Sequence, residues 1–585
     1  MRSKRFAFQV AACLVMVMPL RAARAGVADV EAVLRLMPAD SPVSVVVVDF
    51  EKLDKTLAAV VKSIKSDAES PHILADIKKD LGIADWIDFS KPVGMAQPSL
   101  DGGGQSTLWA VVPGFAEKVK TVADAKEEDG VWHLTFESKS DVFAKAKGGY
   151  VIASESKEGL AFATKEGKNL ADELKTRMDL LANRDALVHL NFDPIRPMAL
   201  GGIAQGAQMA PMLGMMLGQQ GGADPMAMTS ALTGLFDGIK KFVEQVNYID
   251  LSIGVTETAG NLTIATGYKD GEIKSYLAKQ KPASAAPMSE IEDQPYFVAM
   301  ACHFPGGESP FMDYVFEKMM AASQSPAAGA PGAPGATAPG ATGGSPASAN
   351  NPAAAAGLND AAKEALQLSR DLYRKVEGWN SVIAMTSSGM KVSGDYLGGD
   401  TQGILDLSKK TMAKVNPLTK SFNGGASYES LGSKKIGDAS VDQFAVKFDT
   451  TNPAAAQAAQ MMGENTRFSV GVARGRVRYC MGSDEDAGRV FSGKVEKSLA
   501  SNKVVAEAIA TLPAKRNAVL LIDPAGLLPL IGPMMGMPKV EPMPPGPPVA
   551  ISVSISGEPA RVDINIPFKA IERVVRALSP QPPPT

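Results

Sequence analysis

Methionine is concentrated in one stretch of this sequence, and its thioether sulfur is a ligand that soft metal ions such as Cu(I) accept. The segment 198–237 is rich in Gly and Met, and a shorter counterpart lies at 527–543. Unbranched Met side chains also adapt to many apolar shapes, so both segments could instead cover an apolar ligand or contact a partner. The third interpretation, which we favour, is a loosely packed helical crossover beside a sheet. If the segments bind, the candidate ligand-binding residues are Met209, Met212, Met215, Met216, Met534, Met535 and Met537.

Three aspartates follow similar apolar runs, where gathered carboxylates could serve metal binding or acid-base chemistry. These are Asp49, Asp193 and Asp523, and Pro comes directly after the last two. An Asp-Pro pair is typical of a helix start, because Asp accepts backbone N–H bonds and Pro at the first helical position needs no donor. We therefore predict helix caps at all three positions.

The remaining motifs in the sequence contain no catalytic set. Ser388 and Lys391 match S-x-x-K, but that motif needs a helix and this stretch predicts a hairpin turn. Four histidines lie far apart in the sequence and never in an H-E-x-x-H arrangement, namely His72, His133, His189 and His303. The sequence therefore predicts no catalytic residue, no metal site, no cofactor and a protein that is not an enzyme.

Two cysteines, Cys302 and Cys480, fall in strand-like runs of the second half of the chain. In an oxidising compartment they could form one disulfide. Alternatively, each is a separately buried thiol that behaves as a small apolar side chain.

The amino terminus has the pattern of an export signal. MRSKR gives a positive start, 6–20 is an apolar stretch of secretory length, and Ala23-Arg24-Ala25 offers a cleavage site. We therefore predict a signal peptide over 1–25 and a protein located in the periplasm or cell envelope. Two alternatives remain open, which are lipidation at Cys13 and retention of the segment as an uncleaved anchor.

Composition narrows the possible partners. The 585 residues include 60 basic and 63 acidic side chains, for a formal charge of −3. Proteins that bind nucleic acid concentrate Lys and Arg to replace the counterions of phosphates, so we expect no nucleic-acid partner. After the signal, no stretch reaches the ~18 uninterrupted apolar residues of a membrane helix, so we expect no membrane span.

A repeated order of elements indicates the fold. Apolar runs and turns predict a strand, a helix, two short strands and a closing helix, and this order begins near 43, 187, 297 and 519. In the second unit, the apolar residues of 249–255 alternate with Asp250, Ser252 and Gly254, which predicts one buried and one solvent-facing side of a hairpin. We predict an α+β fold of antiparallel sheets with helices on one face, built from four β-α-β-β-α units in two pseudo-repeated halves.

One segment cannot take part in a core. Residues 325–357 hold no charged and no aromatic side chain and are mostly Ala, Pro and Gly, so they cannot bury enough apolar surface to offset ordering. We predict a disordered linker there. The first α+β half then spans 26–285, and the second half, which the linker interrupts, spans 286–585.

The start of the mature chain is similar to that of certain secreted bacterial proteins of unassigned function. The sequence Leu36-Met37-Pro38-Ala39-Asp40-Ser41 is followed by VSVVVVDFEKL, and those proteins open with a signal peptide, a P-A-D-[ST] turn, an apolar strand and a helix. The resemblance implies export. It implies no activity or catalytic residue, because that group has none established.

These patterns together predict a non-catalytic exported protein of the cell envelope that acts as a binding or scaffolding module for an unknown envelope protein. The alternative is a carrier or sensor of an apolar ligand such as a lipid, which would use the segments 198–237 and 527–543 as a lining or lid.

Overall fold

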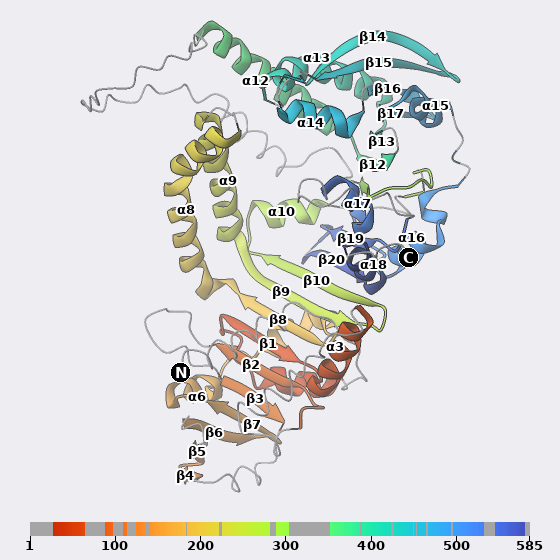
Figure 1. Cartoon of the computed structure of the whole chain (residues 1–585). Helices are drawn as coiled ribbons and strands as arrows, with labels where there is room; N and C mark the ends of the chain where they lie inside the picture. Colours follow the sequence, from red (N-terminus) through yellow and green to blue (C-terminus); the bar gives the residue numbers. More distant parts are fainter. Residues whose placement is uncertain are drawn as a thin grey trace, which may run out of the picture.

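One antiparallel sheet runs through the part of the chain that the structure describes, and its middle joins the two halves of the sequence (Figure 1). The α+β class and the antiparallel pairing predicted from the sequence are confirmed. The computed structural model describes residues 27–64, 88–97, 109–113, 125–135, 141–182, 184–221, 225–280, 288–289, 291–303, 352–386, 389–422, 426–448, 450–451, 453–463, 466–492, 495, 497–531, 545–557 and 559–578.

Within those residues the sheet has 20 strands, shared equally by the two halves of the sequence. The strands of the first half are β1 (Val43–Val47), β2 (Val93–Gln97), β3 (Trp109–Pro113), β4 (Lys126–Glu128), β5 (Val131–Thr135), β6 (Asp141–Lys147), β7 (Tyr150–Ser154), β8 (Ala186–Asn191), β9 (Val246–Val255) and β10 (Ala259–Tyr268). Those of the second half are β11 (Val298–His303), β12 (Gly378–Thr386), β13 (Gly389–Leu397), β14 (Ala426–Ile436), β15 (Ala439–Phe448), β16 (Arg467–Ala473), β17 (Arg476–Gly482), β18 (Ala518–Ile522), β19 (Val549–Ser554) and β20 (Ala560–Pro567).

Both halves arrange their strands in the same order. The first half runs β4-β5-β6-β7-β3-β2-β1-β8-β9-β10. The second half runs β14-β15-β16-β17-β13-β12-β11-β18-β19-β20. Strands β10 and β20 then pair with each other, with Thr263 opposite Asp563. The closing helix predicted for the first unit, at 115–122, lies outside the described residues, so the division into four equal units stays a prediction.

The described helices lie between these strands along the chain, except that α2 precedes β1 and α18 follows β20. In the first half they are α2 (Val27–Arg35), α3 (Phe50–Ile64), α6 (Lys157–Thr164), α7 (Leu170–Leu174), the 3₁₀ helix η1 (Lys175–Leu180), α8 (Phe192–Gly221), α9 (Pro225–Gln245) and α10 (Glu272–Lys279). In the second half they are α12 (Pro352–Lys375), α13 (Thr401–Phe422), α14 (Pro453–Met462), α15 (Asp484–Ser492), the 3₁₀ helix η2 (Leu499–Ser501), α16 (Lys503–Ala510), α17 (Pro524–Ile531) and α18 (Phe568–Leu578).

Helices cover both faces of the first half of the sheet, whereas the sequence pattern predicted helices on one face. Val45 and Val47 of β1 pack in one cluster with α3 and α18, and Val46 and Val48 pack in another with α2, α6 and α7. Successive side chains of a strand point to opposite faces, so the nearly continuous valine run of 43–48 needs cover on both sides. That run was the signal for a sheet buried on two faces.

The closing helices of the two halves are exchanged. Phe568 at the start of α18 lies in the core of the first half with Phe50 and Val255. Leu277 of α10 packs in a cluster that includes Ile555 of the second half. Each half therefore supplies part of the other's core, so the β10–β20 junction is held by packing as well as by the strand ladder.

The predicted linker is shorter at its carboxyl end than the sequence suggested. Residues 325–351 lie outside the described residues, but 352–357 form the beginning of α12. Four consecutive alanines after Pro352 explain this difference, because Ala is the best helix former and Pro suits the first helical position.

Candidate functional site

The Met-rich segment forms a helical hairpin, α8 and α9, that stands beside the sheet (Figure 1). The predicted residues Met209, Met212, Met215 and Met216 lie on α8 with exposed fractions of 48%, 57%, 55% and 50%. Three of them, at 209, 212 and 216, share one face of the helix because they are three and four residues apart. The structure therefore brings four of the seven candidates together on one open surface. The other three, Met534, Met535 and Met537, lie outside the described residues.

Glycines bring the two helices of the hairpin close together. A Cβ atom on Gly206 would lie 2.7 Å from the Phe236 ring, and one on Gly214 would lie 2.1 Å from Thr229 Oγ1. Small residues at these positions let α9 pack directly on the α8 backbone. The glycines thus let the two helices pack closely, with Phe236 against Gly206, while several other apolar side chains are exposed. Leu235 and Ile239 of α9, for example, are 57% and 39% exposed.

Arg196 fixes the base of the hairpin. Its Nη2 donates to Val246 O at 2.6 Å and its Nε donates to Val243 O at 3.3 Å, which ties the start of α8 to the end of α9. Its Nη1 pairs with Asp193 at 2.7 Å, and Lys269 Nζ pairs with the same carboxylate at 2.6 Å. The Lys269 and Arg196 bonds hold the pKa of Asp193 below its ordinary value. The hairpin therefore leaves the sheet from a rigid base.

Two of the three predicted helix caps are confirmed. Asp49 Oδ1 accepts from Lys52 N at 2.9 Å, and Asp523 Oδ1 accepts from Ala525 N at 3.1 Å. The prediction was wrong for Asp193, which lies inside the first turn of α8. Asn191 takes its place, because Asn191 Oδ1 accepts from Asp193 N at 3.1 Å. The three carboxylates are therefore structural or paired, and they do not gather into a reaction centre.

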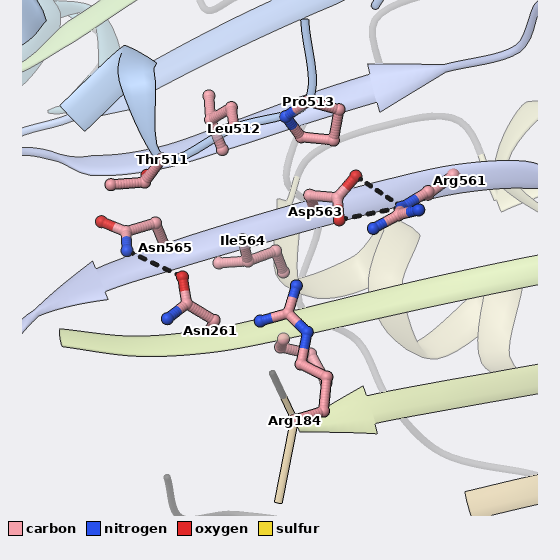
Figure 2. A pocket seen from close by; sticks show the side chains of 10 residues that line it. Arg184, Asn261, Thr511, Leu512, Pro513, Arg561, Asp563, Ile564 and Asn565 are labelled. Atoms are coloured by element: carbon pink, nitrogen blue, oxygen red, sulfur yellow. Dashed lines mark hydrogen bonds and ion pairs between the residues drawn. The ribbon is translucent and has the colours of Figure 1, made fainter. Parts of the chain in front are cut away.

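A cavity of about 300 Å³ lies where the two halves of the sheet meet (Figure 2). The β10–β20 ladder contributes one side of it, and the loops that precede β8 and β18 contribute others. Thr511, Leu512 and Pro513 belong to the second of these loops. The polar side chains along the ladder and from the first loop are Arg184, Asn261, Arg561, Asp563 and Asn565. Residues from both halves thus line one small polar space.

Hydrogen bonds connect the charged groups of this cavity. Arg561 Nε donates to both carboxylate oxygens of Asp563 at 3.0 Å (Figure 2). The Thr263 hydroxyl donates to Asp563 Oδ1 at 2.6 Å and accepts from Arg184 Nη2 at 3.0 Å. Burial lowers the pKa of the Arg184 guanidinium, and the nearby Asp563 carboxylate opposes that shift. The Asp563 carboxylate therefore bonds to Arg561 and Thr263, whereas the hydrogen-bond partner of the Arg184 guanidinium is a neutral hydroxyl.

A buried ionic cluster lies on the face of the β8–β9 ladder that the sequence analysis expected to face water. Asp250 is fully buried, with its Oδ1 2.6 Å from His189 Nδ1 and its Oδ2 2.9 Å from Arg177 Nε. Arg177 also lies over the Tyr248 ring at 3.5 Å. Ser252 is fully buried as well, and its hydroxyl donates to Leu180 O in η1. The alternation was read correctly, but η1 covers the polar side.

Of the two alternatives left open for Cys302 and Cys480, the structure does not show the disulfide, since both are free, buried thiols. They lie on β11 and β17, with β12 and β13 between them in the sheet. Two intervening strands separate the Cα atoms by roughly 14 Å, which is beyond the reach of a disulfide. The separately buried thiol was the correct alternative.

Sequence reasoning missed the residues of the cavity. Thr263 and Asp563 are paired across the sheet but lie 300 positions apart, and only the strand order shows that they meet. Within the described ranges, no three His, Cys, Asp or Glu side chains lie close enough together to hold a metal ion. None of the helices described is both long and apolar enough to cross a membrane. Comparisons with protein-family models, curated proteins and solved structures found no match.

Proposed function

We propose that this chain is a non-catalytic exported protein of the cell envelope that acts as a binding or scaffolding module, and that the α8–α9 hairpin holds its partner. One observation carries this proposal, the row of exposed methionines at 209, 212, 215 and 216, each about half open to solvent. Large apolar side chains that form a contiguous patch on a protein surface mark interaction sites, whereas apolar residues scattered singly do not.

The charges of the hairpin favour an apolar protein surface as the partner. Between Arg196 and Lys240 the sequence has no basic residue and only two acidic ones, Asp224 and Asp237. Helices that lie on anionic lipid carry Lys and Arg along their polar face. An uncharged, Met-rich surface suits an apolar groove or helix of another protein, because Met adapts its shape to the contact. The exposure of the methionines also favours a docking surface over the lining of a lipid-carrying cavity.

Export and location in the envelope rest on the pattern of the amino-terminal segment, with its basic start, apolar stretch and Ala-x-Ala sequence. The pairing of the carboxylates supports a non-catalytic role. Asp49 and Asp523 cap helices, Asp193 pairs with Arg196 and Lys269, and Asp250 pairs with Arg177 and His189.

Site-specific photocrosslinking in cells tests the docking surface. A crosslinking amino acid at position 212 should give one discrete protein adduct, whereas the same group at the exposed Lys503 of α16 should not. The double substitution Met212→Glu and Met216→Glu should remove an adduct formed from position 209, because a carboxylate is costly to bury in an apolar contact. Lys145→Glu on the exposed side of β6 is the matched control and should leave that adduct intact.

The identity of the adduct decides between the candidate functions. A protein adduct that is reproduced with the two purified proteins supports the docking module, and a second copy of this chain would make the module a self-assembling scaffold. Adducts with lipid alone would favour the apolar-ligand carrier. Equal labelling from positions 212 and 503 would show that the hairpin is not a specific docking surface.

A further inference from the structure

We propose that the cavity between the two halves binds a small organic molecule through its carboxylate, and that the Arg184 guanidinium is the group that holds this carboxylate. This site is separate from the hairpin, because the hairpin extends from the far ends of β8 and β9. Two observations support this site. The Arg184 guanidinium has N–H donors without an acceptor among the described residues, and residues of both halves line the cavity beside it.

The two arginines of the cavity differ in the acceptors that their guanidinium groups bond to. Arg561 is shared by two carboxylates, with Nε on Asp563 at 3.0 Å and Nη1 on Asp179 Oδ2 at 3.0 Å. Among the described residues, Arg184 has one hydrogen-bond acceptor, the neutral Thr263 hydroxyl. A guanidinium carries five N–H donors in a planar fork, so most of the Arg184 donors have no acceptor in the described part of the protein. A bound carboxylate would supply two acceptors in the matching geometry.

The second half shows what the same arginine does when it is purely structural. Arg184 and Arg516 hold matching positions, because each lies two residues before a strand, β8 or β18. Arg516 Nη1 donates to the Ile509 and Pro513 carbonyl groups of its own loop, at 3.2 and 3.0 Å. Arg184 instead donates to Thr263 on β10, the junction strand of its own half. It thereby lines the cavity (Figure 2). The difference between the halves leaves one of the two guanidinium groups available to a ligand.

The other lining residues define the ligand further. Asn565 Nδ2 donates to Asn261 Oδ1 at 2.9 Å, which leaves the Asn261 amide N–H groups as donors for a second polar group. Leu512 and Pro513 offer a small apolar contact. The volume of about 300 Å³ lies at the lower end of small-molecule sites. A phosphate is less suited, because the Asp563, Asp185 and Asp179 carboxylates already act on the Arg184 charge and would repel a second negative charge.

Calorimetric titration of the purified full chain with acetate, lactate and benzoate tests the proposal, with inorganic phosphate and neutral benzamide for comparison. At least one carboxylate should bind, and benzamide should bind more weakly than benzoate. Arg184→Gln should weaken binding at least about tenfold, because hydrogen bonds to charged groups are the strong ones. Arg35→Gln, the same change at an exposed arginine of α2 that does not line the cavity, should leave affinity nearly unchanged. A bound carboxylate should also raise the melting temperature, because it binds only the folded chain.

Two further variants keep the test independent of folding. Leu512→Trp should fill the cavity and abolish binding with every charge retained, and Arg184→Lys should keep the charge but lose part of the affinity, because Lys lacks the planar fork. Circular dichroism shows whether each variant is folded. The proposal is overturned if none of the three carboxylates binds at millimolar concentration, if Arg184→Gln binds as the parent does, or if phosphate binds more tightly than the carboxylates.

Discussion

Asp185 and Asn517 occupy the same place in the two halves of the molecule. Asp185 Oδ2 accepts from Val255 N at 2.8 Å, and Asn517 Oδ1 accepts from Ile555 N at 2.9 Å. Both side chains are buried, at 5% and 2% exposure. Each lies just before a strand, β8 or β18, and accepts from the end of the neighbouring strand. One half therefore uses a carboxyl group where the other uses its neutral isostere.

The carboxyl group makes stability depend on pH. Burial raises the pKa of Asp185 from 3.8 to about 7, against smaller opposing effects of the Val255 N–H, Lys52 and Arg184. Between these values the folded chain keeps a proton that the unfolded chain has lost. The contribution of Asp185 to the free energy of unfolding therefore falls as pH rises from about 4 to about 7, and it is constant above that range.

Asp185→Asn should stabilise the protein at pH 8 by about 1–4 kcal/mol and have much less effect near pH 4. Urea unfolding at several pH values measures this. Asn517→Asp is the reciprocal variant, and it should be more destabilised at pH 8 than at pH 5. Equal effects of Asp185→Asn at both ends of the pH range would contradict the shift.

Asp250 should be the most sensitive charged residue in the first half. Asp250→Ala leaves the Arg177 guanidinium, 6% exposed, without its buried counterion, and we expect a loss of about 3–5 kcal/mol in the free energy of unfolding. Asp250→Asn should cost less because an acceptor remains. Asp270→Ala is the control, since Asp270 is 98% exposed in its pair with Lys274 and should show no measurable change. Similar losses for Asp250→Ala and Asp270→Ala would refute a structural role for the cluster.

The two thiols should be unreactive in the folded protein. Burial raises the pKa of Cys302 and of Cys480 to about 12, so almost no thiolate is present at pH 8. Iodoacetamide should label neither cysteine under native conditions and both in urea without a reductant, as read by peptide mass. A reductant should not change the melting temperature. Failure to label in urea until a reductant is added would indicate a disulfide instead.

The sequence predicts those helices and strands that have a clear hydrophobic periodicity of their own. The alternation over 249–255 corresponds to β9, and the closing helix of the unit that begins near 519 corresponds to α18. Strands β14 to β16 were not predicted, because ASYESLGSKKI is polar and β14 exposes most of the side chains that are described. In the described sheet β14 pairs with β15 alone, in a tight hairpin with Ile436 opposite Ala439. Backbone pairing rather than an apolar pattern therefore holds that strand in place.

The two candidate sites, the methionine surface and the cavity, also differ in whether the sequence pattern reveals them. The exposed methionines were found because composition marks them. The cavity was not found, because Arg184, Thr263 and Asp563 are ordinary residues until the register of β10 and β20 brings them together. His189 and Asp250 are likewise direct partners in the β8–β9 ladder, a relation that no spacing in the sequence indicates.

Glycines on α8 provide a matched pair of substitutions that tests how the hairpin is built. Gly214 faces Thr229 so closely that a Cβ atom would lie 2.8 Å from the Thr229 backbone, whereas a Cβ atom on Gly202 meets nothing within 4 Å. Gly214→Ala should therefore force the helices apart and destabilise the hairpin by about 1–3 kcal/mol. Gly202→Ala should stabilise α8 by about 0.5–1 kcal/mol, because Ala loses less backbone entropy in a helix.

Hydrogen exchange of peptides from 192–221 and 225–245 measures both effects locally. Exchange should be faster in Gly214→Ala and slower in Gly202→Ala, while peptides from β9 and β10 should be unchanged in both. If both alanines slow exchange, helix propensity alone governs the hairpin and the close contact with Thr229 does not. Since the exposed methionines depend on this hairpin for their arrangement, Gly214→Ala should also weaken any adduct formed from position 212, and Gly202→Ala should not.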